Sequence, residues 1–172
     1  YYHMHDFERK ILGAKGTSIF AVGQAGFIIK SNSGQLLAID LYLSECVERV
    51  EGNVGFKRLL PKILNPFALE FDVVICTHPH RDHFDIDAVP GMLSNGRTKL
   101  YCSINCASLV EAFQLEYYES QITYVKPSES YDIGDFHINF VNCDHGVDAS
   151  DAVGVVVTVD GKTIYESGDT CL

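Results

Sequence analysis

Three histidines and an aspartate fall within six consecutive positions of this sequence. The stretch THPHRDHFD, residues 77–85, places His78, His80, Asp82 and His83 in the pattern HxHxDH. Side chains at positions i and i+2 of an extended chain point the same way, so His78 and His80 can bind one metal ion together. Asp82 and His83 follow where the chain turns, and they can face a second ion nearby. Imidazole and carboxylate ligands favour zinc, manganese or iron, and the absence of thiolates from the cluster argues against a zinc finger.

The segment before the histidines is predicted to be a buried strand. FDVVICT (71–77) is a continuous apolar run, which is typical of a strand covered on both faces. The histidine cluster would then lie at the C-terminal edge of that strand. Further strands are expected at residues 17–23, 26–31, 35–43, 99–103, 121–125 and 135–143, with a hairpin over 152–168. Helices are expected at residues 57–64, 85–96 and 106–115.

The order of these elements predicts a single α/β domain. Antiparallel strands at the front are followed by alternating strands and helices, with no repeat or linker between them. We therefore expect one domain over residues 1–172, in which residues 1–16 form an N-terminal extension with a frayed end.

Composition excludes several classes of function. A chain of 172 residues with 47% hydrophobic and 21% charged residues is typical of one globular domain. Its net charge of −10, without any basic run, disfavours nucleic-acid binding, because phosphate neutralisation needs clustered Lys and Arg. No apolar stretch approaches the roughly 20 residues of a membrane span, so no membrane association is expected. Six scattered cysteines without a CxxC pair predict reduced thiols in a cytoplasmic protein. Assembly into a homo-oligomer stays an open alternative.

Two later motifs extend the metal-binding pattern. CDHG supplies His145 at the end of a predicted strand, and SGDT supplies Asp169 at the end of the predicted hairpin. With HxHxDH, these motifs make the sequence resemble the metallo-β-lactamase-fold hydrolases. A finer likeness, from about residue 17 onward, is to the L-ascorbate-6-phosphate lactonase-like branch. That likeness is carried by IFAVGQAGFIIKSNSGQLLAIDLYLS, NPFALEFDVVICTHPHRDHFDIDAV, VKPSESYDIGDFHINFVNCDHG and YESGDT.

The resemblance implies a fold and a set of ligands. The fold would be the family's α+β sandwich, with layers in the order αββα. Two adjacent metal sites would be present, occupied by zinc or manganese. Asp40, at the end of an early strand, would support the histidine loop by hydrogen bonding, because such carboxylates fix the tautomer and orientation of ligands. The ligands implied are His78, His80 and His145 for the first ion, Asp82 and His83 for the second, and Asp169 as the bridge between them.

The ligand set predicts hydrolytic chemistry. Two divalent ions about 3.5–4 Å apart can share a water and lower its pKa toward neutrality. The resulting metal-bound hydroxide would attack an ester, lactone or phosphodiester, with Asp82 or Asp169 as the catalytic group that accepts the proton. Arg81 and Lys126 are weaker candidates for meeting an anionic substrate, and an exposed salt bridge is the favoured role of Arg81. The predicted function is a metal-dependent hydrolase of a small, anionic metabolite, and the resemblance alone favours a lactonase-type reaction.

Two alternatives stay open. A phosphodiesterase or nuclease of the same superfamily would use the same ligands, and a non-catalytic metal-binding module would keep the fold without a working site. In the resembled family the chain continues past the SGDT segment and supplies a further histidine to the second ion. We therefore expect the fold to be C-terminally incomplete here. On that expectation, the first site binds metal better than the second, and the 172 residues alone hydrolyse little.

Overall fold

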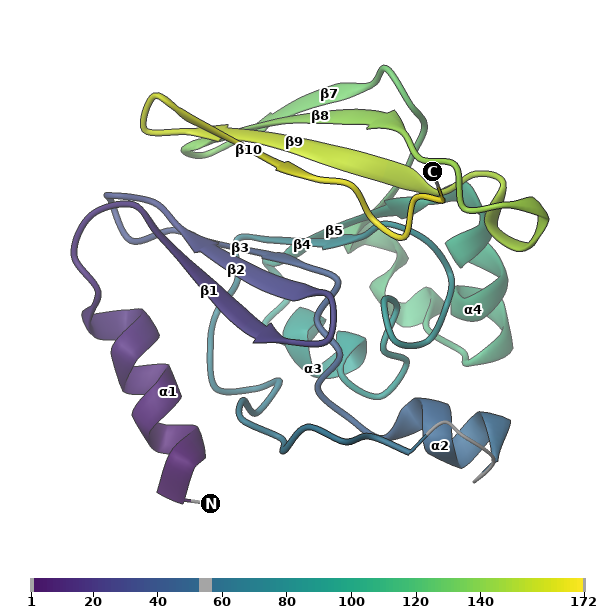
Figure 1. Ribbon diagram of the computed structural model, residues 1–172, viewed down its shortest axis with the longest axis horizontal. Helices are drawn as coiled ribbons and strands as arrows, with labels where there is room; N and C mark the ends of the chain where they lie inside the picture. Colours follow the sequence, from purple (N-terminus) through teal and green to yellow (C-terminus); the bar gives the residue numbers. More distant parts are fainter. Residues whose placement is uncertain (1, 53–56, 172) are drawn as a thin grey trace.

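Two β-sheets packed face to face form the centre of the molecule (Figure 1). The structure is a computed structural model, and it describes residues 2–52 and 57–171. Within these ranges the first sheet has the order β1-β2-β3-β4-β5-β6, and the second has the order β10-β9-β8-β7. The strands of the first sheet are β1 Ser18–Gly23, β2 Gly26–Lys30, β3 Leu36–Ile39, β4 Val73–Cys76, β5 Lys99–Ser103 and β6 Ile122–Val125. Those of the second are β7 Ser130–Ile133, β8 Phe136–Asn142, β9 Val153–Val159 and β10 Lys162–Glu166.

The helices lie on the side of the first sheet that faces away from the second sheet (Figure 1). No helix of the described residues covers the outer face of the second sheet, where His137 and Tyr165 are exposed. The described residues thus form three layers of an α/β sandwich, and the predicted fold class is confirmed. No described helix is long and apolar enough to cross a membrane. The α-helices are α1 Tyr2–Gly13, α2 Cys46–Glu51, α3 Val89–Leu93 and α4 Ala107–Ala112, and the 3-10 helices are η1 Ile104–Cys106, η2 Glu116–Gln121 and η3 Val147–Ala149.

Strand β4 lies between the two cores of the molecule. Val73 and Ile75 belong to the core between the sheets, whereas Val74 and Cys76 belong to the core under the helices. All four side chains are at most 1% exposed, because the second sheet covers one face of β4 and the helices cover the other, while β3 and β5 pair with its two edges. This double burial explains the continuous apolar run, and it confirms the strand predicted before the histidines.

The turns of the second sheet are tied to the first sheet by polar contacts. In the β9–β10 turn, the Asp160 carboxylate accepts hydrogen bonds from Thr17 Oγ1 and from the backbone N–H of Asn32, both at 2.7 Å. In the β7–β8 turn, the backbone N–H of Asp135 donates to Gln35 Oε1 at 2.7 Å. These contacts fix the alignment of the two sheets at one end of the sandwich (Figure 1).

Most of the segment at residues 1–16, which was expected to be an N-terminal extension, is helix α1, and this helix packs against the domain. Ile11 is fully buried in the helical core. The Phe7 ring meets the Phe20 ring edge-on, with the centroids 6.2 Å apart. The buried Lys30 ammonium donates to the carbonyls of Ile11, Leu12 and Ala14 at 2.6–3.0 Å, and this holds the C-terminal end of α1 against β2.

Other predicted elements differ in length or are absent. The helix expected at residues 57–64 does not form, since Pro61 interrupts the segment and Leu59 is 92% exposed. The helix expected at 85–96 shortens to α3. Its preceding turn is capped by the Asp85 carboxylate, which accepts the N–H groups of Asp87 and Ala88 at 3.0 and 3.1 Å. Strand β7 was not predicted, whereas the remaining strands lie where their sequence patterns place them.

Candidate metal centre

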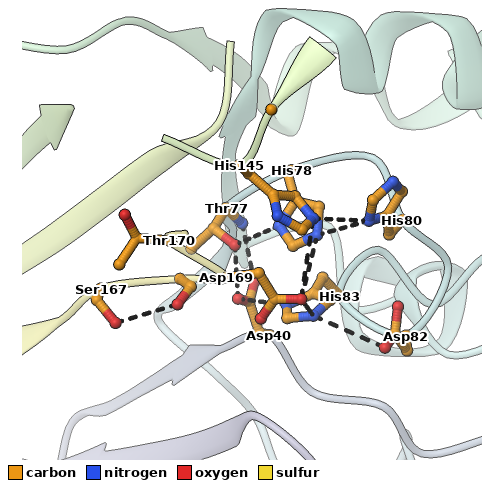
Figure 2. Close-up of polar contacts among 12 residues, drawn as sticks. Asp40, Thr77, His78, His80, Asp82, His83, His145, Ser167, Asp169 and Thr170 are labelled. Carbon is orange, nitrogen blue, oxygen red and sulfur yellow. Dashed lines mark hydrogen bonds and ion pairs between the residues drawn. The ribbon is translucent and has the colours of Figure 1, made fainter. Parts of the chain in front are cut away.

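The predicted ligands gather where strands of both sheets end. The HxHxDH loop begins directly after β4, Asp40 follows β3, His145 follows β8 and Asp169 follows β10. Figure 2 shows these side chains pointing toward one another from separate segments. The sandwich therefore brings together residues that are distant in sequence.

Three imidazole nitrogens converge on one point. His80 Nδ1 lies 3.1 Å from His78 Nε2 and 3.1 Å from His145 Nε2. All three ligand atoms lie within 4.8 Å of one another. Nitrogens bound to one zinc ion at about 2.0–2.1 Å are separated by roughly 3–3.4 Å, so the spacing suits a single shared ion. We call this set the three-histidine group.

Asp169 lies between the three-histidine group and a second set of ligands. Its Oδ2 is 3.1 Å from His83 Nε2, and it is 3.9 Å from both His78 Nε2 and His145 Nε2. Asp82 Oδ2 approaches His83 Nε2 to 3.7 Å. One carboxylate thus faces both sets of nitrogens, as a residue that bridges two ions would. We call Asp82, His83 and Asp169 the acidic group.

Asp40 supports the ligands through hydrogen bonds, and neither of its carboxylate oxygens is left free. It is fully buried, and its Oδ1 accepts the backbone N–H of Thr77 at 2.8 Å. Its Oδ2 accepts hydrogen bonds from Thr77 Oγ1 at 2.6 Å and from His83 Nδ1 at 2.8 Å. Asp40, His78 and His83 also offer ligand atoms within 4.8 Å of one another. Because both Asp40 oxygens already accept hydrogen bonds, we assign this residue to support rather than to ligation.

The hydrogen bonds from Asp40 determine which nitrogens carry protons. Since Thr77 Oγ1 donates to Asp40, it accepts from His78 Nδ1 at 2.9 Å. His78 Nε2 is then left without a proton and faces the three-histidine group. His83 donates from Nδ1 to Asp40, and its Nε2 faces Asp169. A single carboxylate therefore orients one histidine in each group, which is the role such carboxylates play around metal ligands.

The two buried histidines have opposite pKa shifts. Burial, together with the nearby rings of His83, His80 and His145, lowers the pKa of His78 to about 2. Burial also disfavours the charged form of His83, but the hydrogen bond and charge of Asp40, with Asp82 and Asp169, raise its pKa to about 9. His78 is thus available as a neutral ligand at every physiological pH. At neutral pH, by contrast, a metal ion must displace a proton from His83.

Three residues around the site were not singled out from the sequence. Gln24 donates from Nε2 to Asp82 Oδ2 at 3.1 Å. Glu166 accepts the backbone N–H of Gly168 at 3.0 Å and holds the turn before Asp169, while burial and the charge of Asp40 raise its pKa to about 7. Thr77 could have been identified from the sequence, since it directly precedes the HxHxDH motif. Gln24 and Glu166 come from turn and strand ends that carry no pattern of their own.

The weaker candidates lie outside the two groups. Arg81 forms an ion pair with Glu51, in agreement with the role favoured from the sequence. Lys126 is exposed in the segment after β6. His137 is an exposed strand residue that pairs with Asp132.

A pocket of about 740 Å³ opens beside the ligands. His80, Arg81 and Asp82 form the wall that it shares with the metal-binding loop. The remaining wall comes from the β1–β2 turn, Tyr42 after β3, helix α2, residues 57–60, Pro79 of the same loop and helix α4. These residues are Gln24, Tyr42, Val47, Glu51, Lys57, Arg58, Leu59, Leu60, Pro79 and Leu109. Its volume is within the usual range for small-molecule sites.

A family model described as the beta-lactamase superfamily domain matches residues 49–172. The chain belongs to this family. A UPF0173 metal-dependent hydrolase of Saccharolobus solfataricus is 29% identical over 115 residues, covering 66% of this chain and 49% of that protein. A probable L-ascorbate-6-phosphate lactonase of Escherichia fergusonii is 23% identical over 202 residues, covering 91% of this chain and 55% of that protein. The chain therefore spans about half the length of these curated relatives.

Solved structures agree with the fold. A putative metal-dependent hydrolase from Parabacteroides distasonis superimposes with a TM-score of 0.61 at 16% identity, over 91% of this chain and 64% of that one. A metallo-β-lactamase fold protein from Bacillus subtilis superimposes with a TM-score of 0.53 at 21% identity, over 91% of this chain and 59% of that one. These likenesses show that the chain has the metallo-β-lactamase fold.

Proposed function

We propose that this chain carries the metal centre of a hydrolase that acts on a small, anionic metabolite, with a lactone as the favoured substrate class. The observation that carries the proposal is the position of Asp169 Oδ2 between the three-histidine group and His83 Nε2. This arrangement fits two adjacent divalent ions, which we propose to be zinc or manganese. Relatives named metal-dependent hydrolase and lactonase support the same reaction class.

The residues of the two groups have separate tasks in this proposal. A bound divalent ion supplies a Lewis acid that lowers the pKa of a water and polarises the substrate oxygen. The chain itself would hold the nitrogens of the three-histidine group toward the first ion, and Asp40 and Thr77 keep His78 Nε2 unprotonated and oriented toward it. Asp82, His83 and Asp169 would hold the second ion, and either carboxylate could accept the proton that water gives up.

The overall charge bears on the choice of substrate and compartment. A net charge of −10 repels polyanions, which favours a small metabolite over a nucleic acid. All six cysteines are free thiols, which favours a reducing compartment such as the cytoplasm. A phosphodiesterase and a non-catalytic metal-binding module are the alternatives that an experiment must separate.

The proposal is tested by metal content and by a substrate screen. We expect the metal-reconstituted protein to hydrolyse a lactone in a panel of lactones, thioesters and phosphodiesters. His80→Ala should lose the metal bound by the three-histidine group, whereas the matched control His137→Ala, on the outer face of the second sheet, should retain it. Turnover of phosphodiesters alone would establish the nuclease-like alternative. Metal binding without turnover of any panel member would establish the binding module. Full metal content in His80→Ala would refute the ligand assignment.

A further inference from the structure

The pocket beside the metal centre is lined by more cationic side chains than carboxylates, with Lys57, Arg58 and Arg81 against Glu51 and Asp82. Of the acidic groups that line it, Glu51 pairs with Arg81, and Asp82 belongs to the acidic group and accepts from Gln24. Lys57 and Arg58 have no carboxylate partner among the described contacts. The excess positive charge contrasts with the net charge of −10 of the whole chain. The pocket is therefore suited to an anion that the rest of the surface would repel.

Arg58 is held in a fixed orientation on the pocket wall. Its Nη1 donates to the carbonyl of Tyr42 at 2.6 Å, and its Nε donates to the carbonyl of Leu60 at 2.9 Å. The guanidinium carbon lies 4.8 Å from the centroid of the Tyr42 ring. These contacts position the guanidinium without neutralising its charge, and Nη2 has no partner among the described contacts. A planar cation held in this way is preorganised for an oxyanion.

Two further donors of the same wall lack acceptors. Tyr42 is 3% exposed, and its buried hydroxyl, which the backbone N–H of Val47 approaches, has no acceptor for its own proton among the described residues. Burial raises the pKa of Tyr42, so the hydroxyl keeps its proton and can donate. The Nε of Arg81 is likewise buried without a partner among the described residues, although its Nη1 reaches Glu51. Buried donors without acceptors are costly, but both atoms are closed off from solvent, so a ligand in the open pocket would meet the outer ends of the guanidinium groups and not these atoms.

We propose that the guanidinium groups of Arg58 and Arg81 form an oxyanion-binding subsite, which holds the carboxylate or phosphate group of the substrate beside the metal centre. The subsite shares its wall with His80 and Asp82, so one small molecule can place its anionic end at Arg58 and its hydrolysable bond at the metal ligands. This deepens the proposed function, because it names the part of the substrate that is recognised. The binding itself needs no metal and can be measured separately.

The test is a titration of the metal-free protein, in which NMR signals of the arginine Nε–H groups report binding. Methyl phosphate and acetate are the two oxyanion probes, and glycerol is the uncharged probe. We expect an oxyanion to shift the signals of Arg58 and Arg81, with no shift of Arg49 or Arg97 and no effect of glycerol. The probe that binds more tightly distinguishes a phosphate from a carboxylate. Because the charged His83 lies outside this wall, residue-specific signals separate the subsite from anion binding at the ligands.

Substitution gives the second arm of the test. Arg58→Gln should weaken oxyanion binding on the order of tenfold or more, as expected for a charge-assisted hydrogen bond. The matched control Arg97→Gln, whose guanidinium pairs with Glu70 on the surface, should bind within about twofold of the wild type. Unchanged binding in Arg58→Gln, or an absence of shifts at both pocket arginines in the wild type, would overturn the subsite.

The wild-type titration also decides the matter if Arg58→Gln fails to fold. Metal uptake is measured on the same samples with cobalt, whose absorption reports the histidine ligands. A chain that takes up no metal but binds methyl phosphate at Arg58 would refute the proposed function and leave the subsite standing. A chain that takes up metal but shows no response of the Arg58 signal would refute the subsite and leave the proposed function standing.

Discussion

Asp40 connects both sets of ligands through one side chain. It sits where β3 ends, with a φ of 48°, and its two oxygens accept three hydrogen bonds from Thr77 and His83. Asparagine and aspartate adopt this left-handed conformation more readily than most residues. The backbone thus turns away from the strand at the position where the carboxylate is needed under the histidine loop.

Asp40→Asn should therefore weaken metal binding while keeping the backbone conformation. The amide replaces one acceptor oxygen with an NH2 donor, so it cannot accept all three hydrogen bonds that orient His83 and, through Thr77, His78. We expect the affinity to fall roughly 10–100-fold, as for other supporting residues of metal sites, measured by competition with a chelator. Asp72→Asn is the control, because Asp72 accepts the Leu36 N–H at the opposite end of β3. An equal loss in both variants would mean that Asp40 acts only through stability.

Thr77→Val should affect the two groups unequally. The valine has nearly the same shape but lacks the hydroxyl that links His78 Nδ1 to Asp40. His83 keeps its own bond to Asp40, so the three-histidine group should lose affinity while the acidic group changes little. A cobalt titration resolves the two binding steps. Thr77→Ser retains the hydroxyl and should restore binding at the three-histidine group. If it does not, the hydrogen bonds from His78 through Thr77 to Asp40 do not control that binding.

The raised pKa of His83 predicts the pH dependence of stability without metal. Its folded-state pKa of about 9 lies above the ordinary value of 6.5, so the charged ring stabilises the fold fully below pH 6.5. This contribution is lost as the pH rises through about 9. Glu166, with a pKa of about 7, acts in the same direction at lower pH. We expect the Tm of chelator-treated protein to fall from pH 6.5 to 9, less steeply in His83→Gln than in the control His137→Gln. Parallel profiles of the two variants would contradict this.

At the scale of elements, helix α1 depends on Lys30. The ammonium is 7% exposed and donates to three carbonyls at the end of α1. Lys30→Met leaves these carbonyls without their donor, and we expect a loss of about 2–3 kcal/mol in the free energy of unfolding by urea. The control is Lys162→Met, at an exposed position of β10. A similar small loss in both variants would show that α1 is held by its apolar contacts alone.

Elements with an internal pattern could be predicted from the sequence, and elements that depend on distant contacts could not. The β4 run and the ligand motifs carry their own signals, because burial and metal binding constrain adjacent residues. Helix α1 is held by Phe20 and Lys30 from another part of the chain. The segment at residues 57–64 resembled a helix, but Leu59 and Leu60 face solvent and the pocket, and only Leu64 is buried in the core. The positions of Gln24 and Glu166 beside the ligands depend on how the strands pair, so the sequence alone did not predict them.

At the scale of the whole molecule, the two ends of the sandwich are held differently. At one end, Asp160 and Gln35 tie the turns of the second sheet to the first. At the other end, the ligands meet: His78 and His83 follow a strand of the first sheet, and His145 and Asp169 follow strands of the second. Few direct hydrogen bonds join the sheets there, among them that of the Val153 N–H with the Thr77 carbonyl. At the metal-binding end the sheets are joined largely through the ligands themselves, as in the 3.1 Å contacts of Asp169 Oδ2 with His83 Nε2 and of His145 Nε2 with His80 Nδ1.

The division of ligands between the sheets makes a bound ion a reversible cross-link. Like a disulfide, it would close a long loop of chain, here between the histidine loop and the ends of β8 and β10. Local opening of the second sheet would then require release of the ion. Amide hydrogen exchange in β10 should slow when metal is added, whereas exchange in α1 should not change. Equal slowing in both would mean that the ion stabilises the whole fold uniformly. The concentration of available metal would thus determine how often the second sheet opens locally, in addition to the occupancy of the metal site.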